Sequence, residues 1–234
     1  MNHFKSLFAV CVLFMFASAN LMSQDWANLA RYRDENTKLG LPRACDTRVV
    51  FMGNSITQGW IEKVPEFFAN GMYINRGIGG QTTPQMLVRF RQDVIHLYPK
   101  VVVILAGIND IAGNTGPSTL EMIEDNLYSM TELAQTHGIQ VVLCSILPAL
   151  DFPWRPGMEP AEKVLELNKR IKEYARTHGV VYCDYFSAMA DENNGLPKNL
   201  SEDGVHPNKA GYAIMTPLVE RAIAQALLMW KEWK

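Results

Sequence analysis

Cysteine is scarce in this sequence. Only 4 of its 234 residues are cysteines, and Cys11 lies in an N-terminal apolar segment that is considered below. The other three, Cys45, Cys144 and Cys183, are an odd number, which excludes a complete disulfide framework. Because Cys144 and Cys183 lie in apolar runs, we expect them to be buried free thiols in a fold that its hydrophobic core stabilises.

There is also no excess of charge of either sign. Lysine and arginine total 22 and aspartate and glutamate total 24, which gives a formal charge of −2. This balance gives no electrostatic reason to expect nucleic acid or an anionic membrane as a partner. With 48% hydrophobic and 20% charged residues, the composition is that of a globular protein and excludes a disordered or collagen-like chain.

The N-terminal apolar run is too short to span a membrane. It covers residues 7–16, about half of the roughly 20 residues that a spanning helix needs. Lys5 precedes it, and Ala17-Ser18-Ala19, an A-x-A pattern, follows it. This order of charge, apolar run and small residues predicts a secretory signal peptide over residues 1–23. Residues 24–234 then form a single domain, because no charge block, low-complexity tract or long repeat divides them.

A signal peptide predicts a mature protein that is secreted or periplasmic, without stable insertion into the membrane. The pattern allows cleavage after Ala19 or after Ser23. Two alternatives stay open for this segment: a retained N-terminal anchor, and a lipid attached to Cys11. The oligomeric state has no signature in the sequence.

Five apolar runs alternate with amphipathic segments along the rest of the chain. The runs are continuous, which is typical of strands covered on both faces. Between them, apolar residues recur at three- and four-residue spacing, which predicts helices. This order predicts right-handed βαβ units and a parallel sheet. The predicted strands cover residues 48–52, 71–75, 101–106, 140–146 and 180–185, and the predicted helices cover 84–96, 119–137, 161–178 and 210–230.

Three histidines stand where predicted helices end and strands begin. His137 and His178 are each followed by glycine, which takes the left-handed conformation that ends a helix. A histidine there also interacts favourably with the negative end of the helix dipole. We expect these two and His96 to be structural, because helix ends that enter strands lie at the sheet edge opposite the ligand-binding edge.

The ligand-binding edge of such a sheet lies beyond the carboxyl ends of its strands. Ser55 follows the first predicted strand and is the candidate nucleophile. A serine hydroxyl needs an adjacent base. With the structural histidines set aside and His3 removed with the signal peptide, His206 is the remaining candidate. Asp203 precedes it by three residues, so one loop presents both side chains and the carboxylate orients the imidazole.

Acyl transfer also requires hydrogen-bond donors for the developing oxyanion. The backbone N–H of Ser55 and those of Gly77, Gly79 and Gly80 are candidate donors, since glycine lets the backbone approach a ligand closely. The side-chain amide of Asn109 is a further candidate. The same glycines also suit a tight turn. The neighbouring Asp110 is interpreted as a helix cap or Asx-turn residue and is left out of the catalytic set.

These segments form four ordered blocks, at residues 53–55, 75–82, 107–110 and 203–207. They resemble the four blocks of the SGNH hydrolases, the GDSL esterase/lipase superfamily, which is named after Ser, Gly, Asn and His. Asn54 stands where the family often has aspartate, at a position outside the triad. The family glycine matches Gly80 best, with Gly79 as the competing alignment.

The resemblance implies a flavodoxin-like three-layer α/β/α sandwich with a five-stranded parallel sheet. It implies that Ser55 attacks an ester carbonyl, that His206 acts as base and then as acid, and that Asp203 orients the histidine. Ser55 N–H, Gly80 N–H and the Asn109 side chain would form the oxyanion hole. The resemblance implies no metal and no organic cofactor.

Within the superfamily, the sequence resembles secreted bacterial acylhydrolases of the platelet-activating-factor acetylhydrolase-like and carbohydrate O-acetylesterase types. We therefore expect a secreted serine esterase that removes short acyl groups, acetyl in particular, from a small-molecule or glycan ester. Trp60 and Trp154 are candidate substrate contacts, since aromatic rings stack on sugars, although they also fill cores. The alternatives are a lipase or lysophospholipase using the same triad, and a non-catalytic carbohydrate-binding domain.

Overall fold

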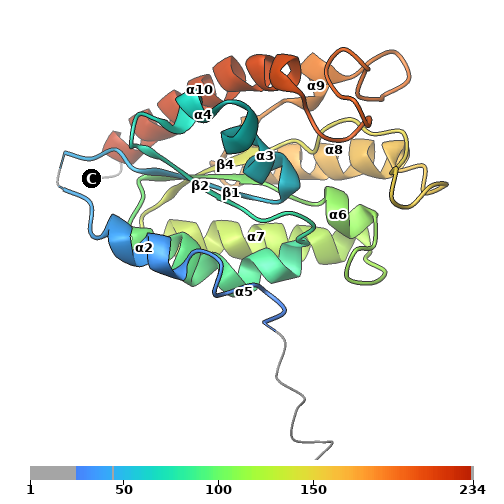
Figure 1. Ribbon diagram of the computed structural model, residues 1–234. Coiled ribbons are helices and arrows are strands. Elements are labelled where there is room, and N and C mark those ends of the chain that lie inside the picture. Colours follow the sequence, from blue (N-terminus) through green and yellow to red (C-terminus); the bar gives the residue numbers. More distant parts are fainter. Residues whose placement is uncertain (1–24, 44, 233–234) are drawn as a thin grey trace, which may run out of the picture.

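The computed structural model describes residues 25–43 and 45–232 and shows a sheet with helices on both of its faces (Figure 1). The predicted signal peptide over residues 1–23 lies outside the described residues. The strands are all parallel, in the order β2-β1-β3-β4-β5, which confirms the predicted three-layer fold with one five-stranded sheet. They are β1 (Val49–Gly53), β2 (Tyr73–Gly77), β3 (Val101–Leu105), β4 (Gln140–Cys144) and β5 (Val181–Cys183).

Two layers of helices cover the sheet. Figure 1 shows α3, α4 and α10 on one face, and α2, α5 and α7 on the other, where α8 packs beside α7. The longer helices are α2 (Arg33–Leu39), α3 (Ser55–Lys63), α5 (Thr83–Asp93), α7 (Leu120–Thr136), α8 (Ala161–Thr177) and α10 (Lys209–Glu232). Short turns of helix are α4 (Pro65–Phe68), η2 (Ile95–Leu97), α6 (Ile108–Ile111) and α9 (Phe186–Met189).

The helix ends predicted to be structural have the expected geometry. Gly138 and Gly179 have left-handed φ angles of 69° and 63°. The histidine before each glycine bonds to a carbonyl in the last turn of the preceding helix. His137 Nδ1 lies 2.7 Å from Leu133 O, and His178 Nδ1 lies 3.0 Å from Tyr174 O. Both histidines therefore cap α7 and α8 at the sheet edge away from Ser55, which confirms their structural role.

The cysteines are also placed as predicted. Cys144 and Cys183 are buried free thiols that face each other across β4 and β5, and burial raises the pKa of Cys144. Cys45 is an exposed free thiol. Across the residues that the structure describes, none of the helices has the length and apolar character required to cross a membrane.

The first three strands end level with one another. Gly53, the last residue of β1, pairs with Gly77 of β2 and with Leu105 of β3. A side chain at either glycine would collide with α3, because a Cβ at Gly53 would lie 2.0 Å from Thr57 Oγ1 and one at Gly77 would lie 2.2 Å from the Gln58 backbone N. The two glycines therefore let α3 start directly against the strand ends. The segments after β1, β2 and β3 meet at this edge.

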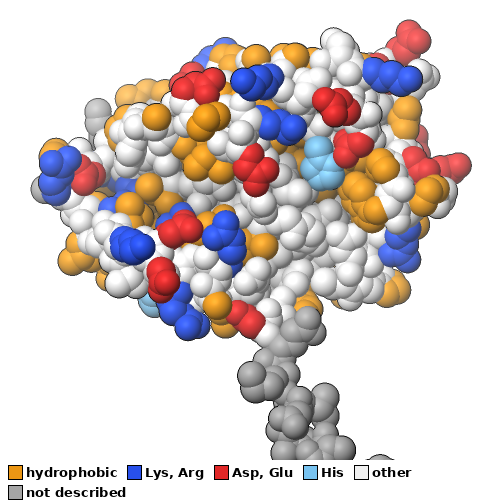
Figure 2. Space-filling model, viewed as in Figure 1, with side chains coloured by type: hydrophobic (Ala, Val, Ile, Leu, Met, Phe, Trp, Pro, Cys, Tyr) orange, Lys and Arg blue, Asp and Glu red, His pale blue; other side chains and the backbone are white. Residues whose placement is uncertain are grey.

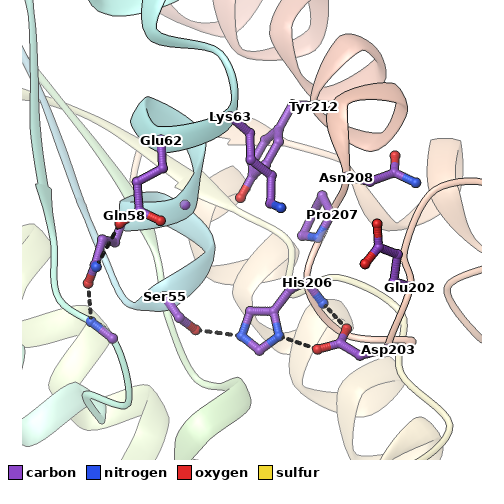
Figure 3. A pocket seen from close by; sticks show the side chains of 12 residues that line it. Ser55, Gln58, Glu62, Lys63, Glu202, Asp203, His206, Pro207, Asn208 and Tyr212 are labelled. Carbon is purple, nitrogen blue, oxygen red and sulfur yellow. Dashed lines mark hydrogen bonds and ion pairs between the residues drawn. The ribbon is translucent and has the colours of Figure 1, made fainter.

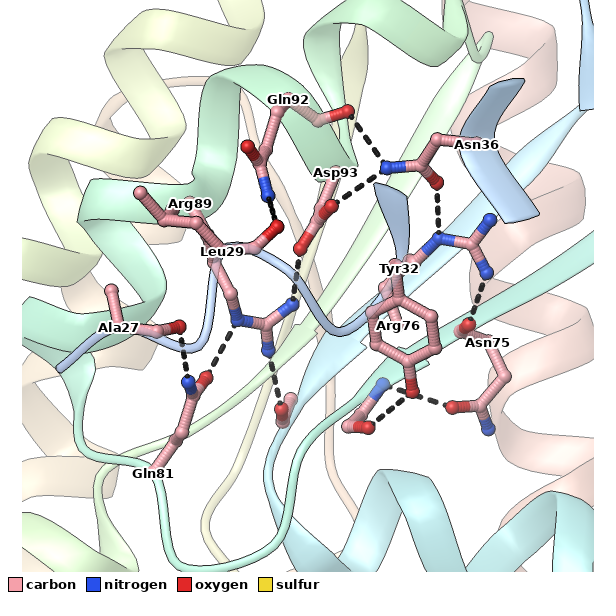
Figure 4. Close-up of polar contacts among 12 residues, drawn as sticks. Ala27, Leu29, Tyr32, Asn36, Asn75, Arg76, Gln81, Arg89, Gln92 and Asp93 are labelled. Carbon is pink, nitrogen blue, oxygen red and sulfur yellow. Dashed lines mark hydrogen bonds and ion pairs between the residues drawn. The ribbon is translucent and has the colours of Figure 1, made fainter. Parts of the chain in front are cut away.

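A buried polar network lies beneath the same edge (Figure 4). Arg89 of α5 is fully buried and donates to Gln81 Oε1 at 2.6 Å, to Asp93 Oδ2 at 3.1 Å and to Gly53 O at 3.0 Å. Gln81 in turn donates to Ala27 O at 2.8 Å, which brings in the N-terminal segment. Arg89 therefore ties the end of β1 to the loop after β2, and its charge is compensated by the equally buried Asp93.

Replacing Arg89 with methionine would leave the Asp93 carboxylate buried without its partner. We expect R89M to lower the free energy of unfolding by about 3–5 kcal/mol, the usual cost of breaking a buried ion pair on one side. Urea denaturation of the wild type and the variant measures the difference. R176M is the matched control, because the Arg176 side chain is 70% exposed and pairs with Glu173, whose side chain is 60% exposed. Such exposed pairs contribute about 0–1 kcal/mol, so equal losses in the two variants would contradict the prediction.

Candidate active site

Ser55 lies at the start of α3, directly after β1. Asn54 caps this helix, because its side chain accepts the Ile56 N–H at 3.0 Å. Ser55 is therefore the first helical residue, and its own N–H has no acceptor within the helix. The hydroxyl and this N–H both stand at the sheet edge where open parallel folds bind ligands.

His206 and Asp203 come from the loop that precedes α10 (Figure 3). His206 Nε2 lies 2.8 Å from Ser55 Oγ, and His206 Nδ1 lies 2.7 Å from Asp203 Oδ2. Because a carboxylate only accepts hydrogen bonds, the neutral imidazole carries its proton on Nδ1 and leaves Nε2 to accept from the serine hydroxyl. The fold thus brings Ser55 together with two residues that follow it by about 150 positions in the sequence.

The Asp203 carboxylate is held in its ionised form. Its Oδ1 accepts the backbone N–H groups of Val205 at 2.9 Å and of His206 at 2.8 Å. Burial acts to raise the pKa of Asp203, but these N–H groups and the His206 ring outweigh it and lower the pKa to about 2. At neutral pH the carboxylate therefore stays charged and accepts the Nδ1–H of the histidine.

Ser201 stabilises the same loop, and sequence reasoning missed it. Its hydroxyl is buried, accepts the Gly204 N–H at 2.9 Å, and lies 2.8 Å from His206 O and 3.1 Å from Asp203 Oδ1. These contacts close the loop on itself and hold the aspartate and the histidine in one rigid turn. A lone serine in a polar loop has no sequence pattern that would have distinguished it.

The loop after β2 forms a tight turn. The Gln81 N–H donates to Ile78 O at 3.4 Å, and Gly80 has a φ of +76°, which the third position of a type II turn requires. The Gly79 N–H donates to Gln58 Oε1 at 2.8 Å. Within the described part of the chain, the Gly80 N–H has no acceptor. Of the two glycines that the sequence left in competition, Gly80 is therefore the one whose amide is free for a ligand.

Two neighbouring polar residues follow β3 and differ in what they contact. Asn109 is 2% exposed, and one hydrogen of its Nδ2 donates to Gln81 O at 2.9 Å, which leaves the second hydrogen of that amide. Asp110 accepts the Thr83 N–H at 2.9 Å and the Thr83 hydroxyl at 2.6 Å. Burial raises the pKa of Asp110 to about 6 in spite of these bonds. Asp110 thus secures the start of α5 from within α6 (Ile108–Ile111), and it is not the local helix cap or Asx-turn residue that the sequence suggested.

The two candidate tryptophans lie in different environments. Trp60 is 1% exposed and stacks on Phe67 and Tyr212, with ring centroids 5.0 and 5.3 Å away. The expectation that Trp60 contacts substrate is wrong, because the position that it occupies on α3 turns its ring into the aromatic core. Trp154 is 45% exposed, and its ring centroid lies 5.8 Å from that of His206. It stands at the edge of the site.

A cavity of about 360 Å³ opens beside Ser55. Figure 3 shows side chains from α3 on one of its sides and from the loop before α10 and from α10 on the other. Figure 2 shows acidic and basic side chains around a hollow on this face, with hydrophobic side chains at one side. Among the described residues, no cluster of three or more His, Cys, Asp and Glu side chains is arranged to hold a metal ion. The lining includes Ser55, Glu202, His206, Asn208 and Tyr212.

A protein-family model, that of the GDSL-like Lipase/Acylhydrolase family, matches residues 51–214. The matched range includes the turn that carries Ser55 and the loop that carries His206. The chain belongs to the GDSL-like lipase/acylhydrolase family. This membership confirms the resemblance drawn from the four sequence blocks, and it makes the protein an ester-hydrolysing enzyme.

One solved structure of the family is similar over almost its full length. It is a Bacteroides fragilis protein described as an acylhydrolase, which is 47% identical and has a TM-score of 0.86. The comparison covers 88% of this chain and 100% of that one. The family fold and the acylhydrolase assignment thus agree with each other.

The curated relatives are more distant and longer. An acetylxylan esterase of Xylanibacter ruminicola is 24% identical over 219 residues, which cover 78% of this chain and 44% of the relative. An uncharacterised lipoprotein of Bacillus subtilis is 27% identical over 155 residues, which cover 64% of this chain and 59% of the relative. The chain therefore spans about half the length of the curated relatives that it matches.

The turn after β2 generates a prediction about Gly80. A methyl group there would meet no atom within 4 Å, but it would place an L residue at a φ of +76°. We expect G80A to relieve this strain by flipping the Gly79–Gly80 peptide, which turns the Gly80 N–H away from the ester. The value of kcat for p-nitrophenyl acetate should then fall about 10²- to 10³-fold, as when one oxyanion donor is lost.

The control for this variant is G179A. Gly179 has a similar φ of +63° and equally open surroundings, but it ends α8 at the opposite edge of the sheet. G179A should lower the melting temperature through backbone strain and leave kcat unchanged, because Gly179 lies far from Ser55. A kcat that falls equally in the two, or in neither, would contradict the assignment of the Gly80 amide.

Proposed function

We propose that this protein is a secreted serine esterase that removes short acyl groups, acetyl in particular, from carbohydrate. The observation that carries the proposal is the hydrogen-bonded line from Ser55 through His206 to Asp203, which opens on a polar cavity. A nucleophile, a base and a group that orients the base are the parts that acyl transfer through a covalent intermediate requires.

In the first half of the reaction, Ser55 Oγ attacks the ester carbonyl carbon while its proton passes to His206 Nε2. The imidazolium that forms is stabilised by the ionised Asp203. The tetrahedral intermediate collapses, the bond to the alcohol breaks, and the leaving oxygen takes the proton from Nε2. In the second half, water gives a proton to the same nitrogen as its oxygen attacks the acyl carbon. The bond to Ser55 Oγ then breaks, Oγ takes the proton from Nε2, and the acid leaves.

The negative charge that develops on the carbonyl oxygen needs donors that are in place beforehand. In the proposed mechanism these are the Ser55 N–H, the Gly80 N–H and the remaining Nδ2 hydrogen of Asn109. The Ser55 N–H is free because Ser55 begins a helix. The Gly80 N–H is free because the nearby acceptor, Gln58 Oε1, is bonded to the Gly79 N–H instead. The remaining hydrogen of Asn109 Nδ2 is oriented by the other one, which donates to Gln81 O.

The surroundings of the nucleophile favour a sugar as the alcohol component. The cavity beside Ser55 is lined in part by the exposed charged side chains of Glu202 and Lys63, groups that bind hydroxyls. Trp154 adds an exposed aromatic ring next to His206. The acetylxylan esterase among the curated relatives supports the same substrate class, although it is similar at only 24% identity.

One observation favours the second candidate, a lipase or lysophospholipase. A cavity of about 280 Å³ lies on the other side of the aspartate, and it is lined largely by apolar side chains such as Leu150, Phe152 and Leu196. It touches Asp203 but not Ser55, so a long acyl chain would have to pass the triad to reach it. We therefore favour the short-acyl esterase.

The proposed location follows from the N-terminal sequence. Residues 1–23 carry the features of a signal peptide, and residues 24–234 would be the exported domain. A lipoprotein among the relatives supports export to the cell envelope or beyond.

The function is tested with residues 24–234 and two p-nitrophenyl esters. The wild type should hydrolyse the acetate faster than the octanoate. S55A and H206A should each lower kcat by several orders of magnitude, because the triad acts as a unit. S187A is the control, since Ser187 is an exposed serine on α9 outside the cavity. An S55A variant that keeps the wild-type rate would refute the serine mechanism, and a preference for octanoate would favour the lipase.

The role of Trp154 is tested on a sugar substrate. We expect W154A to lower kcat/KM for an acetylated xylo-oligosaccharide about ten-fold, which corresponds to about 1.4 kcal/mol of lost contact, and to spare p-nitrophenyl acetate. W26A is the matched control, because Trp26 is similarly exposed at 50%. If both substrates lose rate equally in W154A, the ring supports His206 and does not bind the sugar.

A further inference from the structure

We propose that Gln58 and Glu62 form a positioning pair that selects which backbone amide of the loop after β2 serves the oxyanion. This inference rests on the proposed function and goes beyond it, because neither side chain belongs to the triad or to the donor set. Ser55, Gln58 and Glu62 are spaced at three and then four residues along α3, so the three lie on one face of the helix.

The pair contacts the loop directly (Figure 3). Gln58 Oε1 accepts the Gly79 N–H at 2.8 Å, and Gln58 Nε2 donates to Glu62 Oε1 at 2.9 Å. Gly79 also lies against the nucleophile, since a Cβ built on it would lie 3.8 Å from Ser55 Cβ. The bond to Gln58 is therefore made at the point where the loop passes the reacting serine.

The chemistry of the two side chains sets the direction of this contact. A glutamine amide has an accepting end and a donating end, whereas an ionised carboxylate only accepts. Glu62 thus takes the Nε2 end of Gln58 and leaves Oε1 to face Gly79. Without Glu62 the amide could rotate, and its NH₂ group would then oppose the Gly79 N–H.

Holding the Gly79 N–H has a consequence for the next peptide. The Gly79–Gly80 peptide is the central unit of the turn, and flipping it exchanges the directions of its C=O and N–H. The far side of the turn is secured separately, because Gly80 O accepts from Asn114 at 3.1 Å. On the near side, Gln58 supplies the side-chain acceptor for the Gly79 N–H. With the Gly79 N–H bonded to Gln58 and Gly80 O bonded to Asn114, the peptides on both sides of the turn keep their places, and the Gly80 N–H is the amide of this turn that is left for the oxyanion.

Both residues are open to replacement without loss of the fold. Gln58 is half-buried and Glu62 is exposed, and neither belongs to the core. Because the pair is exposed to solvent, Glu62 orients Gln58 only partly, and its loss should matter less than the loss of Gln58 itself.

The test uses p-nitrophenyl acetate, whose alcohol makes no sugar contacts. We expect Q58M, which keeps the length of the side chain but not its acceptor, to lower kcat about ten- to hundred-fold with KM changed less than three-fold. E62A should lower kcat two- to five-fold, and E62Q should restore most of that loss, since its carbonyl still accepts from Nε2. The double variant Q58M/E62A should match Q58M, because Glu62 acts through Gln58.

The matched control is Q135M, a glutamine at the opposite end of the molecule that donates to His178 O at 3.3 Å. Melting temperatures of all variants separate a structural effect from positioning. Unchanged kcat in Q58M would overturn the proposal, and so would losses in Q58M and E62A that simply multiply in the double variant. Failure of the proposed function is seen separately, as an inactive wild type or an active S55A.

Discussion

Gly53 pairs with Gly77 on one side and with Leu105 on the other, and the rest of the site depends on this level ending of three parallel strands. Because neither glycine has a side chain, α3 begins directly against the strand ends, and Ser55 and its N–H point out of the same edge. The loops that carry Gly80 and Asn109 start level with it. The three proposed oxyanion donors, which come from distant segments, therefore converge without any long loop to hold them.

The buried polar network around Arg89 holds these segments in place at the sheet edge. Arg89 and Asp93 are both buried, and burying an ion pair contributes little stability compared with an apolar pair of similar size. The guanidinium instead offers several donors in a fixed plane, so one side chain holds both Gly53 O and Gln81 Oε1. Gln81 O then accepts from the Asn109 amide, so the buried Arg89 guanidinium helps to orient the Asn109 side chain through Gln81.

The two sides of Ser55, the proposed nucleophile, are held in place by different means. On the base side, Asp203 and His206 share a loop that Ser201 closes, and backbone N–H groups keep the carboxylate ionised with a pKa of about 2. On the proposed oxyanion side, side chains hold the glycine turn after β2: Gln58 accepts the Gly79 N–H, and Asn114 donates to Gly80 O. Glycine suits this turn because its backbone reaches a φ of +76°, but the same freedom makes external contacts necessary.

The sequence by itself determined the parts that depend on local pattern. Continuous apolar runs predicted the strands, glycine after His137 and His178 predicted the helix ends, and four ordered blocks identified the family, because each signal lies within a few adjacent residues. Only the tertiary structure decided that Trp60 is buried and that Gly79 contacts Gln58. These outcomes depend on how α3 rotates against the sheet and on which loop packs beside it. Such contacts join distant segments, and no spacing along the chain encodes them.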